Sequence, residues 1–302
     1  MLNDKIAIVT GAASGIGYAV AQALRQEGAQ VVMADVNEAL LRESARKLGG
    51  VPFVGNLTKR EDCRQLVDFT AQRFGRIDIL ANVAGVQHVC PIEEFPEDKW
   101  DFIISLMLTA PFLLTRYCWP YMKENGWGRI INMSSIHGLV ASEFKSAYVS
   151  AKHGLIGFTK TAAMEGGSLG ITCNAICPAY VMTPLVEKQI AAQAQTHGIP
   201  EDKVISDIML SKAAIKKMVP AENIGAIVKF LCSDAADSIT GIALPIDGGW
   251  TANLPAFPPP PSPHIGKSPM PDASGFFPWY REANHQIWFF SASSSSHSRK
   301  SG

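Results

Sequence analysis

Short apolar runs alternate with longer amphipathic segments over the first 250 positions of the chain. The runs "KIAIVT" (5–10), "QVVMAD" (30–35) and "VPFVGN" (51–56) have the length of strands. The segments between them repeat their apolar positions with the period of a helix. Because a strand that is buried on both faces reads as an unbroken apolar run, this alternation predicts a parallel sheet with helices on both sides.

The same alternation continues through the second half of the chain. Further strands are predicted at 76–85, 127–135, 171–180 and 243–250. Helices are predicted as two stretches at about 97–108 and 109–125, and as one long stretch at about 147–166. The segment at about 183–218 is helical but less regular, and we expect it to close over the substrate as a lid. The alternation ends near residue 253, so we expect a single domain over 1–253.

The composition changes after Asn253. The segments "FPPPPSPHIGKSPMPDASG" and "SASSSSHSRKSG" are rich in Pro and Ser, which predicts a disordered tail over 254–302. Between them, "FFPWY" and "IWFF" are aromatic enough to dock on the domain or on a partner. A tail without function is the interpretation that we favour over docking.

Charge and cysteine usage exclude several classes of protein. The chain carries 27 basic and 27 acidic side chains, without the basic excess of a binder of nucleic acids or anionic membranes. No uninterrupted apolar run approaches the length of a membrane span, and the N-terminus lacks the pattern of a secretion signal. The six cysteines form no CxxC pair and no metal-binding spacing, which indicates buried free thiols, no metal and a cytoplasmic protein.

A glycine-rich loop, "TGAASGIG" (10–17), joins the first predicted strand to the first predicted helix. Gly11, Gly15 and Gly17 permit a tight turn and a close approach of the backbone to a pyrophosphate at the helix N-terminus. Asp35 ends the next strand, 18 residues beyond Gly17. By itself such an aspartate is an ordinary solvated charge. After this loop, it is placed to accept hydrogen bonds from ribose hydroxyls and to repel a 2′-phosphate, which predicts NAD as the cofactor.

Tyr148 and Lys152 lie four residues apart on a predicted helix and therefore share a face. A free tyrosine loses its proton near pH 10 and is a poor base at neutral pH. We expect the Lys152 ammonium and a positive nicotinamide ring to lower the pKa of Tyr148. Ser135 ends a strand and can hold the oxygen of a substrate.

These segments together resemble the short-chain dehydrogenase/reductase family. The resemblance rests on "TGAASGIG", "NVAG" (82–85), Ser135, "YVSAK" and "CPAYVMTP", and it extends from about residue 4 to residue 252. It implies an α/β fold with a doubly wound, Rossmann-type sheet of about seven parallel strands. It also implies a homotetramer.

The resemblance also implies roles for the matching residues. Ser135 would orient the substrate, Tyr148 would act as acid and base, and Lys152 would bind the ribose and tune Tyr148. The implied cofactor contacts are Gly11, Ser14, Gly15, Ile16, Gly17, Asp35, Asn56, Leu57, Asn82, Ala84, Gly85, Tyr148, Lys152, Pro178, Val181 and Thr183.

Three positions depart from the family pattern. Val83 replaces an asparagine of the family pattern, and we expect this change to be tolerated because the backbone at this position matters more than the side chain. Asn56 replaces a frequent aspartate beside the adenine, and we expect its carbonyl oxygen to remain an acceptor. Met107 falls where the family has a helix asparagine that holds a proton-relay water, and a thioether is a poor substitute.

A second group of polar residues predicts the kind of substrate. Ser135 and His137 have the same parity along an extended segment, so both can face one cleft. Lys145 leads into the helix that carries Tyr148. An ammonium and an imidazole, which is partly protonated at neutral pH, suit a small anionic substrate.

Within the family, this arrangement resembles the enzymes that oxidise D-3-hydroxybutyrate. The resemblance implies a clamp for the substrate carboxylate, formed by Gln87, His137, Lys145 and Gln189. Tyr180 stands where these enzymes are expected to have a tryptophan beside the substrate methyl group.

We therefore expect NAD-dependent oxidation of (R)-3-hydroxybutyrate to acetoacetate, with Tyr148 as acid and base. One alternative is another oxidoreductase of the family, such as a 3-ketoacyl thioester reductase. Asp35 argues against NADPH, and a carboxylate clamp argues against a thioester. The other alternative is an inactive family member that acts as a binding protein. Met107 and the tail motivate it, whereas the intact Ser135, Tyr148 and Lys152 argue against it.

Overall fold

A computed structural model describes residues 2–183, 186–187, 190–191, 194 and 198–252 of the chain. Gln189 and the predicted tail at 254–302 lie outside the described residues.

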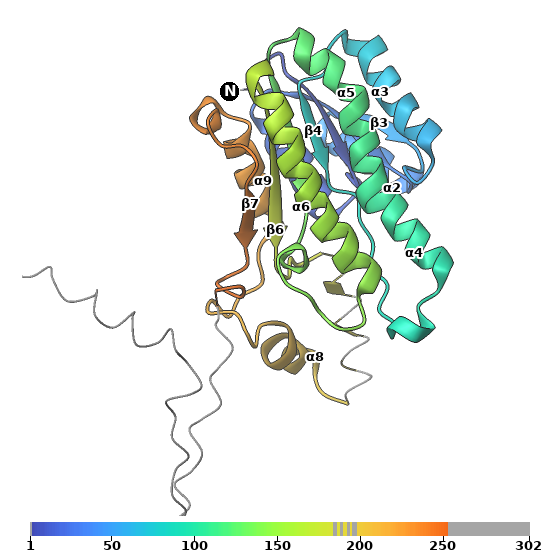
Figure 1. The fold of residues 1–302 in the computed structure, drawn as a ribbon, viewed down its shortest axis with the longest axis vertical. Helices are drawn as coiled ribbons and strands as arrows, with labels where there is room; N and C mark the ends of the chain where they lie inside the picture. The colour runs from blue at the N-terminus through green and yellow to red at the C-terminus, as the bar shows by residue number, and fades with distance from the viewer. Residues whose placement is uncertain (1, 184–185, 188–189, 192–193, 195–197, 253–302) are drawn as a thin grey trace, which may run out of the picture. The chain divides into compact units, whose positions relative to one another are not determined.

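Seven parallel strands form the sheet of the described part of the chain (Figure 1). They are β1 (Ile6–Thr10), β2 (Gln30–Asp35), β3 (Val51–Val54), β4 (Ile79–Asn82), β5 (Gly128–Met133), β6 (Ile171–Pro178) and β7 (Ala243–Ile246). Their order, β3-β2-β1-β4-β5-β6-β7, reverses direction between β1 and β4. This is the predicted doubly wound fold, and ligands of such sheets bind at the carboxyl ends of the strands beside the reversal.

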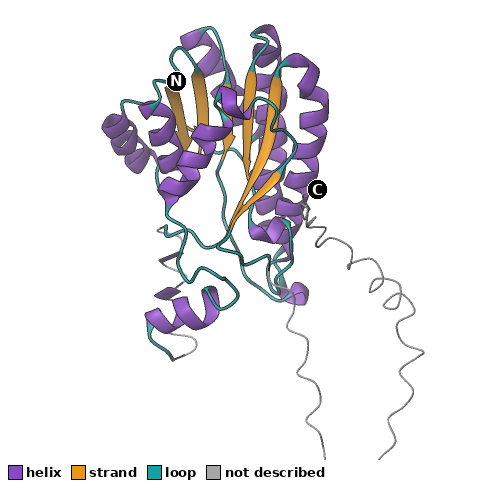
Figure 2. Ribbon diagram, turned by 90° about the vertical axis from the view of Figure 1, so that its left-hand side faces the viewer, coloured by secondary structure: helices purple, strands orange, loops and turns teal. Residues whose placement is uncertain are grey.

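Helices cover both faces of the sheet (Figure 2). The first face is covered by α1 (Gly15–Gln26), α2 (Glu38–Leu48) and α9 (Ala221–Leu231). The second is covered by α3 (Arg60–Phe74), α5 (Ala110–Glu124) and α6 (Ser146–Gly166). All five residues of β1 are buried, and alternate ones pack into the core on either face, as the unbroken apolar run predicts.

The two helical stretches predicted at about 97–108 and 109–125 form one continuous helix, which corrects that prediction. Its parts are α4 (Glu97–Ile104), a π-helical turn, η2 (Ser105–Thr109), and α5. Met107 lies buried in the π turn. The span Glu97–Glu124 is long and apolar enough to cross a membrane by length and composition. Here it packs against α3 and α6, as a core helix does.

The predicted lid at 183–218 is described only in part. Its described residues include a short helix, α8 (Glu201–Lys203), and a second π turn, η5 (Val204–Met209). Val204, Met209 and Ile190 form a small apolar cluster against which Tyr180 packs. The backbone N–H groups of Ala214 and Ile215 both donate to the carbonyl of Gly248, which ties this segment to the turn after β7.

Candidate active site

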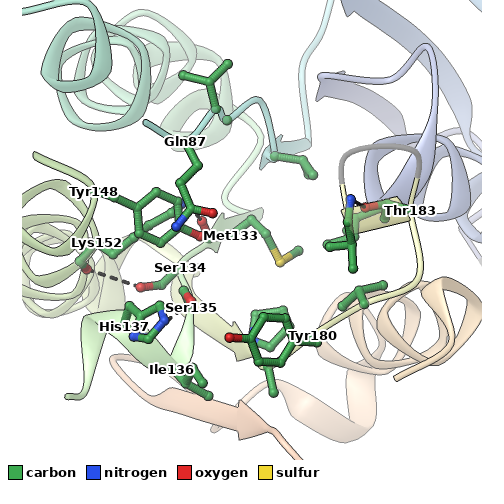
Figure 3. A pocket seen from close by; sticks show the side chains of 18 of the residues that line it. Gln87, Met133, Ser134, Ser135, Ile136, His137, Tyr148, Lys152, Tyr180 and Thr183 are labelled. Carbon is green, nitrogen blue, oxygen red and sulfur yellow. Dashed lines mark hydrogen bonds between the residues drawn. The ribbon is translucent and has the colours of Figure 1, made fainter. Parts of the chain in front are cut away.

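A pocket opens at the carboxyl ends of the central strands, and most of the predicted site residues line it (Figure 3). Its predicted members are Ile16, Gly85, Gln87, Ser135, His137, Lys145, Tyr148, Lys152, Pro178, Tyr180, Val181 and Thr183. A neighbouring pocket is lined by Gly11, Asp35, Asn56, Leu57, Ala84 and Gly85. Gly85 borders both pockets. Their arrangement fits one extended ligand that runs from the end of β2 to Ser135, Tyr148 and Lys152.

The glycine loop leaves room for such a ligand. Gly11 has φ +64°, and a Cβ there would lie 2.9 Å from the Cα of Ala84. Gly15 has φ +55°, and a Cβ there would lie 3.1 Å from the Thr183 side chain. A Cβ on Gly17 would collide with the carbonyl of Gly11. Ser14 makes no side-chain cap on α1, so the first N–H groups of the helix remain available to a pyrophosphate.

Thr10 connects this loop to the loop that follows β4. Its hydroxyl accepts hydrogen bonds from the backbone N–H groups of Val83 at 2.9 Å and Ala84 at 3.1 Å. Thr10 was not among the predicted site residues. Thr10 could have been identified from its position at the end of a buried strand, directly before Gly11.

Asp35 and Asn56 border the neighbouring pocket, each within a local hydrogen-bond network. The Asp35 carboxylate accepts from the backbone N–H groups of Ala13 at 3.1 Å and Asn37 at 3.0 Å. The Asn56 Oδ1 atom accepts from the N–H group and the hydroxyl of Thr58, at 3.1 and 2.8 Å. The Asn56 carbonyl oxygen, which we expected to remain an acceptor, thus accepts both of these hydrogen bonds within its own loop.

Asn82, which was predicted to contact the cofactor, supports the strands instead of lining either pocket. It is buried, and its Nδ2 atom donates to Asn132 Oδ1 at 2.8 Å. Asn132 in turn donates to the Thr159 hydroxyl at 2.9 Å, which connects β4 through β5 to α6. These bonds fix the helix that carries Tyr148 against the sheet.

Ser135, Tyr148 and Lys152 meet in the first of these pockets, at the carboxyl ends of the central strands. Ser135 ends the segment after β5, and its Oγ atom accepts from the backbone N–H of His137 at 3.2 Å. Lys152 is buried, and its Nζ atom donates to the carbonyl of Met133 at 2.6 Å. The same Nζ atom lies 5.5 Å from the centroid of the Tyr148 ring. Gly138 lets this segment pack on α6, because a Cβ there would lie 2.9 Å from the carbonyl of Lys152.

Burial dominates the ionisation of Tyr148 in the chain itself. Burial raises the pKa of the Tyr148 phenol above its ordinary value, and a hydrogen bond with Ser135 offsets part of this rise. Burial also lowers the pKa of Lys152 to about 8. Lys152 alone therefore does not bring the Tyr148 pKa below its ordinary value, because desolvation outweighs its effect; the prediction also included the charge of a bound nicotinamide and stays a prediction. Without a further positive charge, Tyr148 remains a protonated phenol at neutral pH.

His137 and Lys145 lie side by side at the edge of the pocket, with 3.3 Å between Lys145 Nζ and His137 Nε2. Burial, followed by the charge of Lys145, lowers the pKa of His137 to about 4. The ring is therefore neutral at pH 7 and supplies hydrogen bonds. This corrects the expectation of partial protonation.

Two aromatic residues fix the His137 ring. Tyr148 and Trp250 each meet it edge to face, with ring centroids 6.3 and 6.2 Å away. Trp250 was not selected from the sequence, although it follows the carboxyl end of β7, where residues of such a site gather.

The remaining predicted substrate contacts have different outcomes. Figure 3 shows Gln87 extending into the pocket from the loop after β4, whereas Tyr180 enters from the segment after β6. Gln189 is among the residues that are not described. Within the described part of the chain, no group of three or more His, Cys, Asp or Glu side chains is placed to hold a metal ion.

Comparison with known proteins agrees with this geometry. The family described as enoyl-(acyl carrier protein) reductase matches residues 11–251. The D-beta-hydroxybutyrate dehydrogenase of Cupriavidus necator is 44% identical over 257 residues, which cover 83% of this chain and 100% of that protein. The enzyme of the same name from Rhizobium meliloti is 46% identical, over 82% of this chain and 99% of its own length. A 3-oxoacyl-[acyl-carrier-protein] reductase from Thermotoga maritima is 34% identical, over 82% and 98%.

Proposed function

Because the chain belongs to the short-chain dehydrogenase/reductase family and is an oxidoreductase, we propose that it oxidises (R)-3-hydroxybutyrate to acetoacetate with NAD. The names of the two relatives with 44% and 46% identity support this substrate. The observation that carries the proposal is the pairing of Lys145 with a neutral His137 in the pocket that also holds Ser135 and Tyr148. An ammonium paired with an uncharged hydrogen-bonding ring suits a single carboxylate.

The residues of this chain divide the reaction between them. Ser135 holds the substrate hydroxyl, and Tyr148 receives its proton as the carbon at position 3 loses hydride. The nicotinamide supplies the hydride acceptor and, in its oxidised form, a positive charge. That charge and the Lys152 ammonium favour the phenolate of Tyr148 against the cost of burial. The glycine loop holds the pyrophosphate, and Asp35 receives the ribose hydroxyls.

The direct test is the formation of NADH from each enantiomer of 3-hydroxybutyrate by the full-length protein. We expect turnover of the R enantiomer and little of the S enantiomer, because the hydroxyl and the carboxylate are held at separate places. Equal turnover of both, or of neither, contradicts the proposal.

Removing the ammonium of Lys145 should weaken the reaction of the acid more than that of its ester. Lys145→Met keeps much of the side-chain length without the charge. A charged hydrogen bond contributes about 1.5–3 kcal/mol, so kcat/KM on 3-hydroxybutyrate should fall at least about tenfold. Its neutral methyl ester should lose far less. Steady-state kinetics on both substrates measures the difference.

Lys160→Met is the matched control, because Lys160 is exposed on α6, the helix that begins directly after Lys145. It should change neither substrate. His137→Gln should show the asymmetry of Lys145→Met more weakly, because the His137 ring carries no charge at neutral pH. Equal losses on acid and ester in Lys145→Met would assign Lys145 to structure and would remove the support for a carboxylate clamp.

Neutralising Asp35 should narrow the preference for NAD over NADP. Two like charges about 4 Å apart near a protein surface repel by about 4 kcal/mol before screening by salt. We therefore expect Asp35→Ala to reduce the ratio of kcat/KM for the two cofactors at least about tenfold. Glu43→Ala, on the exposed side of α2, should leave the ratio unchanged. A native preference for NADP would overturn the assignment of NAD.

The alternatives meet specific obstacles. A thioester substrate has no carboxylate for Lys145 to bind, although the relative from Thermotoga maritima carries the name of such a reductase. A binding protein without activity would not need Ser135, Tyr148 and Lys152 in one pocket.

We also propose a cytoplasmic homotetramer whose domain spans 1–253 and whose tail, 254–302, is dispensable. An aromatic face on α5 and α6 supports association with further copies. Phe112 is 43% exposed, and its ring lies 6.0 Å from that of Phe158.

A further inference from the structure

The hydroxyl of Tyr180 enters the candidate active-site pocket. The ring packs against the lid cluster of Val204 and Met209, which fixes its direction. Figure 3 shows the hydroxyl turned toward the side of the pocket that holds Ser135 and His137. No hydrogen bond to it is present among the described residues. The half-buried phenol thus has a donor and an acceptor to offer to a ligand.

The chemical state of Tyr180 suits this role. Burial raises the pKa of its phenol, so the group stays protonated and uncharged at neutral pH. Removing a hydroxyl from water without a hydrogen-bond partner costs free energy. A ligand that carries its own hydroxyl can supply the missing hydrogen bond and so removes this desolvation cost. A methyl group leaves the cost in place.

The part of the substrate that reaches Tyr180 follows from the four substituents of the reacting carbon, and this step rests on the proposed function. The oxygen is held by Ser135 and Tyr148, and the hydrogen faces the nicotinamide. The carboxymethyl arm extends to His137 and Lys145. The fourth substituent must face the remaining wall, to which Tyr180 contributes from the lid side.

We propose that Tyr180 is a specificity-determining residue that selects substrates with a hydroxyl on this fourth substituent. The preferred substrate class is then the 3,4-dihydroxy acids, with 3,4-dihydroxybutyrate as the smallest member. Hydride leaves position 3 for the nicotinamide, and the proton of the 3-hydroxyl passes to Tyr148. The product is 4-hydroxy-3-oxobutyrate, and the 4-hydroxyl remains intact against the phenol of Tyr180.

Three acids test the proposal with the full-length protein and NAD. (R)-3-Hydroxybutyrate has the methyl group, and (S)-3,4-dihydroxybutyrate has the same spatial arrangement with a hydroxymethyl group. (R)-3-Hydroxypentanoate matches the hydroxymethyl group in size but lacks the hydroxyl. A site built to bind a hydroxyl discriminates strongly against an analogue without it, so kcat/KM for the dihydroxy acid should exceed that for the pentanoate at least about tenfold.

Tyr180→Phe should bring this ratio to about one, because the ring stays while the hydroxyl is lost. Tyr117→Phe, on α5 and outside the pocket, should keep the native ratio. Two results overturn this inference but leave the proposed function standing. In the first, the native protein oxidises 3-hydroxybutyrate but does not prefer the dihydroxy acid over the pentanoate. In the second, Tyr180→Phe slows the oxidation of all three acids equally. The second result would assign the hydroxyl to the carboxylate or to catalysis. Failure to form NADH from any of the acids overturns both this inference and the proposed function.

Discussion

Tyr148→Phe should lower the turnover of 3-hydroxybutyrate at least about a hundredfold while NAD still binds. General acid–base groups contribute about a hundredfold or more, and Tyr148 is the phenol that shares the pocket with both Ser135 and the Lys152 ammonium. His137 is neutral, but its ring lies edge to face against Tyr148, with 6.3 Å between centroids, and is held by Lys145. The measurement pairs steady-state kinetics with the dissociation constant of NAD.

The pairing of these two readouts separates chemistry from structure. A variant that loses both turnover and NAD binding would indicate a disturbed pocket, and Tyr148 would then have no demonstrated role as acid and base. Turnover within about a few-fold of the native rate would exclude Tyr148 as the proton acceptor, since a phenylalanine ring cannot bind a proton.

Lys152→Met should also reduce turnover at least about a hundredfold near neutral pH, and the loss should shrink as the pH rises. A nearby opposite charge lowers the pKa of an acid by about one to three units. Burial already raises the pKa of Tyr148, so without the ammonium the phenolate forms only at still higher pH. The rising limb of the pH profile should therefore move upward by about two units or more, as measured by kcat/KM from about pH 6 to about pH 10.

The native profile should turn down again where Lys152 loses its proton. Burial places the pKa of this ammonium at about 8, so its support for the phenolate is complete below that pH and fades above it. The Lys160→Met control should keep the native profile. If Lys152→Met lost activity equally at every pH, Lys152 would serve only to hold the cofactor and the carbonyl of Met133.

The fold could be predicted from the sequence because the strands are continuous apolar runs and their burial follows from that pattern. Ser135, Tyr148 and Lys152 could also be placed together, because their spacing matches a strand end and one face of a helix. In the structure all three line one pocket, and the chemical roles given to them are proposals.

Other properties depend on contacts between distant segments, which no local pattern reveals. The neutral state of His137 results from burial and from Lys145, eight residues away in the chain. Trp250 reaches His137 from the far end of the sequence. The hydrogen bonds from Thr58 to Asn56 join residues that are close in the chain. They still could not be predicted, because the Asn56 side chain can adopt several orientations. Whether the pKa of Tyr148 rises or falls depends on how deeply the phenol is buried, and the sequence does not give that depth.

In genetic terms, the π turn at Ser105–Thr109 behaves as a one-codon insertion within an α-helix. Each residue advances an α-helix by about 100°, so the surplus residue turns α5 by about that angle relative to α4. Met107 thereby approaches the loop after β4, where its sulfur lies 3.5 Å from the N–H of Val86, while Leu113 and Leu114 pack toward the sheet. After a one-codon deletion in this turn, Met107 could not contact the loop after β4 while Leu113 and Leu114 pack toward the sheet. Substitutions on either side of the turn leave the relative orientation of α4 and α5 unchanged. The surplus residue lets one helix serve the pocket and the core separately.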